Sequence, residues 1–327
     1  MERFSFARYF AEINTLADLQ FMPGEKPYID RPSTPADRKN LLLYLGCNVL
    51  RTAHLARTVI GVLKAMGFDF NAAGGPAHCC GIIHQQNNDT KGAQALAANS
   101  MRHFAKYGAT KVLMWCPSCN DHYDEVVAKE QDVAFRYEPV TEFIARHLER
   151  VRFVRRVEKR VAMHCHMGHA QSLLDSACTR AILGAIPGVD LIELDEAAIP
   201  GRHCNPKWIW QMGRAQWRRT IDGMLDAAKH ARVDVLATLY HSCHREICQQ
   251  ESNYPFAVVN YVTLLGEAMG IEYPDLYKRY KVVGDPEAVF NQVQPYVRAN
   301  HLDPDRVREV LRNAFAPACE PDASNPS

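Results

Sequence analysis

The chain has 327 residues, 47% of them hydrophobic and 23% charged, and a net charge of +1. These values are typical of a globular protein of about two domains, and the near-neutral charge gives no electrostatic reason to expect nucleic acid as a partner. No apolar run approaches about 18 residues and the N-terminus lacks a signal core, so we expect a cytoplasmic protein without a membrane span. Eleven cysteines in that compartment indicate metal or redox chemistry rather than disulfides.

Apolar runs alternate with helical patterns after an N-terminal extension, 1–40, that carries one amphipathic helix. A β-α-β-α-β alternation of this kind predicts an α/β fold with a parallel sheet, because continuous apolar strands are typical of sheets buried on both faces. The expected strands are 41–45, 68–73 and 111–115, and the expected helices are 55–66 and 91–107.

The same scheme begins again near residue 158. Three strands are expected at 160–163, 189–194 and 233–240, with helices at 172–183 and 208–230. The offsets from Cys47, Cys79 and Cys119 to later cysteines are 118, 125 and 124 residues, as in an internal duplication. We therefore predict two pseudo-symmetric lobes, each with a small mostly parallel sheet flanked by helices. The lobes are expected at 41–157 and 158–270, followed by a helical tail at 271–327 with capping signals at Asp285 and Asp303.

Five cysteines of the first lobe form three groups. Between the first two groups lie 31 residues, and between the second and third lie 35. Each group follows a predicted strand, and the carboxyl ends of parallel strands meet at one edge of a sheet. We therefore expect these thiols to converge: Cys47, Cys79, Cys80, Cys116 and Cys119.

Several kinds of site could use cysteines in this grouping. Zinc usually takes four ligands in two short pairs, and a lone Cys-x-x-Cys would suit a redox pair, but neither accounts for all five cysteines. Free cysteines are also common as small buried hydrophobes. Adjacent Cys79 and Cys80 need an irregular loop or two different metal atoms, because successive side chains of a strand point to opposite faces. Iron–sulfur chemistry is the leading interpretation.

One cysteine, a Cys-Cys pair and a Cys-x-x-Cys at these spacings resemble the CCG-domain family. Its best-known member is the cysteine-rich subunit of heterodisulfide reductase, and related proteins serve lactate, glycolate, glycerol-3-phosphate and succinate or fumarate systems. The resemblance covers about 41–270. It implies a noncubane [4Fe–4S] cluster bound by the five first-lobe cysteines.

The second copy of the motif departs from the family pattern. Cys165, Cys204 and Cys243 match three of its cysteines, while Asn205 and Tyr240 stand where the other two are expected. The resemblance therefore leaves a full noncubane cluster in the second lobe in question.

Several outcomes remain open for that second site. Its three cysteines with a histidine would form a second metal site, such as a smaller iron–sulfur centre, because mixed Cys/His ligation is known. The histidine proposed for it is His241, with His203 and His244 as alternatives. An open iron position would instead bind substrate sulfur, or the site has lost its metal.

The resemblance implies an oxidoreductase subunit that acts on a disulfide, a thiol or a sulfur-carrying substrate. The chain has no ferredoxin-type cysteine run and no Gly-x-Gly-x-x-Gly fingerprint, so electrons must pass through partner subunits. The partners that the resemblance implies are a ferredoxin-like subunit with two clusters, a flavoprotein subunit, and, in bacterial relatives, a lipoate-carrying protein. The degenerate second motif favours a bacterial sulfur-oxidising complex.

The substrate is expected in the cleft between the lobes, with His166, His84 or His122 as the proton carrier. A second hypothesis is an electron-transfer subunit of a lactate, glycolate or succinate type dehydrogenase complex, without its own substrate. A third is a structural protein that binds zinc.

Overall fold

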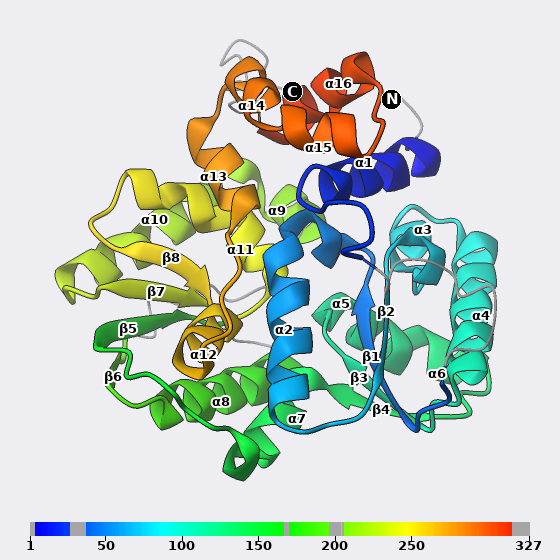
Figure 1. Cartoon of the computed structure of the whole chain (residues 1–327), viewed down its shortest axis with the longest axis horizontal. Helices are drawn as coiled ribbons and strands as arrows, with labels where there is room; N and C mark the ends of the chain where they lie inside the picture. The colour runs from blue at the N-terminus through cyan, green and yellow to red at the C-terminus, as the bar shows by residue number, and fades with distance from the viewer. Residues whose placement is uncertain (1–3, 27–36, 167–169, 196–203, 205, 316–327) are drawn as a thin grey trace.

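Two four-stranded parallel sheets form the centre of the molecule in this computed structural model (Figure 1). The structure describes residues 4–26, 37–166, 170–195, 204 and 206–315. Strand order is β2-β1-β3-β4 in the first sheet and β6-β5-β7-β8 in the second. The predicted α/β fold with two similar lobes is confirmed. The strands are β1 (Leu41–Gly46), β2 (Asn71–Gly74), β3 (Lys111–Met114), β4 (Arg136–Pro139), β5 (Lys159–His164), β6 (Val189–Ile192), β7 (Val235–Thr238) and β8 (Ala257–Asn260).

The first sheet is built around β1, whose apolar run is buried from its second residue onward. Leu42 pairs with Asn71 of β2 and with Val112 of β3, so β1 is a central strand. The helical elements of this lobe are η1 (Asn48–Thr52), α2 (Ala53–Ala65), η2 (Pro76–His78), α3 (Ile82–Gln86), α4 (Thr90–Tyr107), α5 (Pro117–His122), η3 (Tyr123–Val127), α6 (Ala128–Glu130), α7 (Val140–Arg146) and η4 (Leu148–Arg150).

The second sheet repeats this arrangement around β5. One prediction is wrong here: the helix expected over 208–230 is two helices, because Gly213 adopts a φ of +82° that breaks the helical path. The helical elements are α8 (Ala170–Ala185), α9 (Pro206–Met212), α10 (Arg214–His230), α11 (His241–Ile247), η6 (Cys248–Ser252) and α12 (Tyr261–Met269).

A shared hydrophobic core joins the two lobes. Helix α2 of the first lobe packs against α12 of the second, and α7 packs against α8 (Figure 1). One buried cluster contains Leu43 and Val59 from the first lobe together with Val161 and Leu265 from the second. Burial of this much apolar surface holds the lobes together as one body.

The N-terminal helix α1 (Phe6–Asp18) packs on the C-terminal helices, which lie above both sheets in Figure 1. The Tyr280 hydroxyl donates to the Leu19 carbonyl at 3.1 Å. Asp285 caps its helix as predicted, and Asp303 accepts from the Arg306 amide at 2.7 Å. The tail helices are α13 (Leu276–Val283), α14 (Pro286–Gln292), α15 (Gln294–Ala299) and α16 (Pro304–Phe315).

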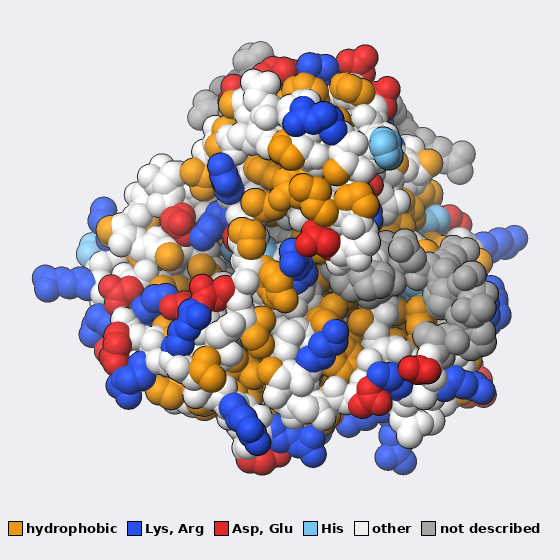
Figure 2. Space-filling view, viewed as in Figure 1, with side chains coloured by type: hydrophobic (Ala, Val, Ile, Leu, Met, Phe, Trp, Pro, Cys, Tyr) orange, Lys and Arg blue, Asp and Glu red, His pale blue; other side chains and the backbone are white. Residues whose placement is uncertain are grey.

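The molecular surface carries charges of both signs. On the face in Figure 2, basic and acidic side chains are interspersed, and hydrophobic side chains gather below the C-terminal helices. Within the described ranges, no helix combines the length and the apolar character needed to cross a bilayer.

Candidate functional site

Five buried cysteines gather at the carboxyl ends of the first sheet. Cys47 follows β1 directly, and Cys79 and Cys80 follow η2, which continues from β2. Cys116 precedes α5 and Cys119 lies in its first turn, just past β3. Each of the five is at most 8% exposed. The parallel arrangement therefore brings together the thiols on which the expected cluster depends.

These thiols interact in a row. Cys47 interacts with Cys79, Cys79 with Cys80, Cys80 with Cys119, and Cys119 with Cys116. Among the described residues, two groups of side chains have ligand atoms that all lie within 4.8 Å of one another. Neither group contains these cysteines. A single ion gathers about four donors around one point, whereas five donors that interact in sequence suit a body of several metal atoms.

Two glycines near the cysteines are in tight contact with neighbouring atoms. Gly46 has a φ of +73°, and a Cβ there would lie 3.0 Å from the Cys116 Cβ and 3.1 Å from the Cys119 Sγ. Gly81 has a φ of +96°, and a Cβ there would lie 2.3 Å from the Ala93 carbonyl oxygen. Both positions therefore require glycine for conformation and for space. The donor set of five cysteines fits an iron–sulfur cluster.

Two of the five thiols have lowered pKa values. Hydrogen bonds from the thiols of Cys119 and Cys79 lower the pKa of Cys80 to about 6. The pKa of Cys116 lies well below its usual value, chiefly because of a hydrogen bond from Cys119 and also because of His241. Metals bind the thiolate form of cysteine, and hydrogen bonds within the set favour that form.

His241 connects the second lobe to the first-lobe cysteines. It is the first residue of α11, it is 3% exposed, and its ring interacts with the Cys116 thiol. The sequence predicts His241 beside Cys204 and Cys243, but the structure places its ring on the other site. The local sequence contains no signal for this contact, because it forms only when α11 packs beside η1 of the first lobe.

The three histidines proposed as proton carriers lie in different surroundings. His122 is buried in α5, which lowers its pKa, and its ring bonds the Cys80 backbone. His84 pairs with Asp89 at 2.7 Å and lies on α3. His166 lies in the second lobe. Of these three, His122 is the one in contact with the first-lobe cysteine set.

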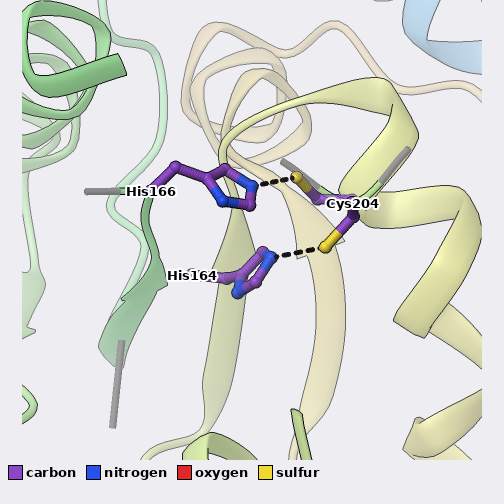
Figure 3. A group of neighbouring side chains, drawn as sticks. His164, His166 and Cys204 are labelled. Carbon is purple, nitrogen blue, oxygen red and sulfur yellow. Dashed lines mark hydrogen bonds between the residues drawn. The ribbon is translucent and has the colours of Figure 1, made fainter. Parts of the chain in front are cut away.

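Two cysteines of the second lobe meet two histidines (Figure 3). The Nε2 of His164 lies 3.2 Å from the Cys204 Sγ, and the Nε2 of His166 lies 3.0 Å from the Cys243 Sγ. All four side chains are 0% exposed, and their four ligand atoms lie within 4.8 Å of one another. The sequence motif pairs Cys204 with Cys243 but does not indicate His164 as a ligand.

Cys165 lies outside this group, and strand register explains why. In the first sheet Tyr44 pairs with Met114, and in the second His164 pairs with Thr238. Met114 and Thr238 each end a strand three residues before a helix begins, so Tyr44 and His164 take corresponding places. Cys165 therefore corresponds to the residue after Tyr44, which is not a cysteine.

That corresponding residue is Leu45, whose side chain belongs to the same interlobe core as Cys165. Side chains alternate along an extended backbone, so His164 and His166 point to one side and Cys165 to the other. The Cys165 thiol interacts with Ser176 instead. The expected alignment of Cys165 with Cys47, the first motif cysteine, is therefore wrong by two residues.

His244, the other alternative ligand, belongs to a third buried group. Its Nε2 lies 2.7 Å from the Asp275 Oδ2, and His54 Nδ1 lies 3.3 Å from the Asp275 Oδ1. Burial lowers the pKa of His54 to about 4, so its ring is neutral near pH 7. Asp275 also caps α13. This group joins α2, α11 and the tail. His203 and Asn205 lie outside the described residues.

Described side chains of the two lobes meet near the strand ends. Trp115 and Tyr240 line a cavity of about 10 Å³ there, room for about one water. The Tyr240 hydroxyl donates to Asp175 at 2.8 Å, and Trp115 stacks on Tyr261. The substrate cleft expected between the lobes stays a prediction.

Comparison with known proteins concerns the first lobe. Residues 41–122 match the family model of the CCG cysteine-rich domain. The matched segment contains all five cysteines of the thiol row and ends before the second lobe begins. A search of curated proteins finds no match.

Two solved structures resemble the chain at low sequence identity. A hypothetical protein from Helicobacter pylori has a TM-score of 0.52 and 11% identity, over 85% of this chain and 57% of that one. The chain thus spans little more than half of that protein, and the likeness concerns the fold alone. An aspartate racemase homologue from Pyrococcus horikoshii OT3 has a TM-score of 0.32 and 8% identity, over 71% of this chain and 98% of that one.

Proposed function

We propose that this protein is an iron–sulfur redox subunit of a heterodisulfide reductase-like complex, acting on a disulfide, a thiol or a sulfur-carrying substrate. One observation carries the proposal: the row of five buried thiols beside Gly46 and Gly81, in a segment that matches the CCG domain. Packing alone accounts for single buried cysteines, but not for five that interact in sequence around two obligatory glycines.

The ligands in this proposal are the five cysteines of the row, and the group they hold is a noncubane [4Fe–4S] cluster. Bound there, the cluster would supply one-electron transfer to chemistry that exchanges electrons in pairs. The chain contributes further polar groups. The Gly81 amide donates to the Cys79 Sγ at 3.4 Å, and such bonds stabilise negative charge on a ligand sulfur.

Two histidines are placed to handle protons. Reduction of a disulfide consumes two electrons and two protons, so proton carriers must lie near the site. His241 hydrogen-bonds to the Cys116 Sγ and favours its thiolate form. His122 bonds the Cys80 backbone. In this proposal, His241 holds a proton beside Cys116, and His122 orients the loop that carries Cys80.

The proposal requires partner subunits. Electrons would pass through a ferredoxin-like subunit with two clusters and through a flavoprotein subunit. The sulfur substrate of a bacterial sulfur-oxidising complex would arrive on a lipoate-carrying protein. The sequence supports this requirement because it contains neither a ferredoxin-type run nor a dinucleotide fingerprint of its own.

A second candidate function is electron transfer within a lactate, glycolate or succinate type dehydrogenase complex, without a substrate of its own. The burial of all five thiols favours it. A buried cluster can pass electrons over a distance, whereas a sulfur substrate must reach it directly.

Electron paramagnetic resonance of the anaerobically purified full chain separates the two functions. A catalytic subunit predicts that a small thiol added to the oxidised protein changes the cluster signal. A cluster that gives no new signal with thiol, but becomes paramagnetic on one-electron reduction, would support the relay function. Protein that contains zinc but neither iron nor sulfide would refute both.

A further inference from the structure

The second lobe contains four metal-binding side chains that the proposed function does not use. They are His164 at the end of β5, His166 two residues later, Cys204, and Cys243 in α11. As Figure 3 shows, the two imidazoles lie side by side and each faces a sulfur. The set joins three chain segments at the carboxyl end of the second sheet.

The spacing of the four ligand atoms fits one ion. Tetrahedral zinc with bonds of about 2.0 Å to nitrogen and 2.3 Å to sulfur holds neighbouring N and S ligands about 3.5 Å apart. The N–S separations here are 3.2 Å and 3.0 Å, and all four atoms lie within 4.8 Å of one another. An iron–sulfur cluster spreads its ligands further apart, because several irons and sulfides lie between them.

The burial of the set indicates a structural ion. All four side chains are 0% exposed, so the donors enclose their centre without a water-accessible position. Two nitrogen and two sulfur donors in a closed tetrahedron are the arrangement of structural zinc sites, whereas catalytic zinc keeps a position for water or substrate. Two adjacent buried thiols without a cation would also be costly to ionise.

Neighbouring residues orient the two imidazoles. The Nδ1 of His164 lies 2.9 Å from the Met224 Sδ, which leaves its Nε2 directed at the sulfurs. The ring of His166 stacks on Tyr240 at 5.7 Å between centroids and 8° between planes. Tyr240 is itself fixed by its hydrogen bond to Asp175. Contacts that hold the ligand rings in place are typical of metal sites.

We propose that the second lobe binds a single zinc ion through His164 Nε2, His166 Nε2, Cys204 Sγ and Cys243 Sγ. The ion fixes α11 to the end of β5. That helix also carries His241, which touches Cys116 of the thiol row, so the zinc positions a residue of the first site. The zinc site does not depend on whether the first lobe holds a cluster.

Zinc K-edge X-ray absorption on the full chain, purified anaerobically, tests the proposal. The expected result is about one zinc per chain with two nitrogen and two sulfur neighbours. Absence of zinc from folded protein would overturn the proposal, as would three sulfur neighbours, or iron and sulfide that disappear with Cys243→Ser. Cobalt substituted for zinc in the wild-type chain should show the visible bands of tetrahedral thiolate coordination, and an octahedral spectrum would contradict the site.

Variants assign the ligands. Cys243→Ser should lose the zinc. His166→Cys should keep the zinc with three sulfur neighbours, because the new thiol replaces the imidazole as a ligand. Cys165→Ser is the matched control, since its thiol is buried in the same lobe but faces the interlobe core. It should keep one zinc with the wild-type neighbours. Cys80→Ser should also keep the zinc, and loss of zinc in either control would overturn the assignment.

Discussion

The two lobes share one scaffold but carry different donor sets. Both sheets are parallel with the same strand order, and in both a helix begins three residues after the third strand ends. The first lobe places five thiols in a row, whereas the second places two thiols and two imidazoles around one point. A duplicated fold thus fixes where ligands gather, and the individual residues decide which metal they suit.

One pair of corresponding positions shows how the difference arises. Tyr44 and His164 take equivalent places at their strand ends, and two residues later the first lobe has Gly46 while the second has His166. At Gly46 the missing side chain lets Cys116 and Cys119 lie close to the backbone. At His166 an imidazole occupies that place and offers a nitrogen ligand. The same position therefore lets two cysteines pack against the chain in one lobe and supplies a ligand in the other.

The largest expected effect comes from adding a side chain at Gly81. Gly81→Ala puts a Cβ 2.3 Å from a backbone oxygen at a φ of +96°, which should cost about 3 kcal/mol of unfolding free energy and abolish iron binding. Denaturant unfolding and iron analysis measure both. Gly184→Ala is the control, because its Cβ meets nothing within 4 Å and should change stability by at most about 1 kcal/mol. Full iron content in Gly81→Ala would contradict the role given to Gly81 in the first lobe.

Gly46→Ala tests the corresponding position directly. The new Cβ would crowd the Cys116 Cβ and the Cys119 Sγ, so we expect iron to fall well below the wild-type content, at a stability cost of about 1–2 kcal/mol. Zinc in the second lobe should stay at one ion per chain. Simultaneous metal and sulfide analysis provides the measurement. Equal losses of iron and zinc would mean that the lobes do not act separately.

His241→Gln tests the contact between the two lobes. Because the ring interacts with Cys116 without being one of the proposed ligands, we expect iron content to remain and the reduction potential of the cluster to shift. A redox titration followed by electron paramagnetic resonance measures the shift. His84→Gln, which alters a histidine paired with Asp89, should leave the potential unchanged. Identical potentials in wild type and His241→Gln would remove His241 from the site.

The smallest effect is expected at Tyr44. Tyr44→Phe removes the hydroxyl that donates to the His78 carbonyl and lies 3.8 Å from the Cys119 Sγ, at a cost of about 1 kcal/mol in stability. Tyr137→Phe is a control whose hydroxyl donates to Asp124 near the surface, and its cost should be smaller. Thermal unfolding compares the two. A larger cost at Tyr137 would contradict the structural role given to Tyr44.

The sequence predicts the central strands and the lobes well, because apolar runs such as 41–45 are buried on both faces of a sheet. It does not reveal β4 or β8. The four residues of β4, Arg136–Pro139, carry two charged side chains and a proline, as befits the edge of a sheet. Nor does periodicity show that the positive φ of Gly213 divides a long helical pattern into two helices.

Cysteine spacing in the sequence predicts the first candidate site but not the second. The grouping of Cys79 and Cys80 with the other first-lobe cysteines follows from motif distances. The second set depends on strand register, which decides that His164 faces Cys204 and His166 faces Cys243 while Cys165 faces away. Counting offsets between cysteines cannot fix register to within two residues, and a two-residue shift changes which side chains meet.

The central claim is that one scaffold carries an iron–sulfur cluster in its first lobe and a single zinc ion in its second. Iron, acid-labile sulfide and zinc, counted together on anaerobically purified full chain, test it most directly. The account predicts about four iron, about four sulfide and one zinc per chain. About eight iron with no zinc, or zinc without iron and sulfide, would contradict it.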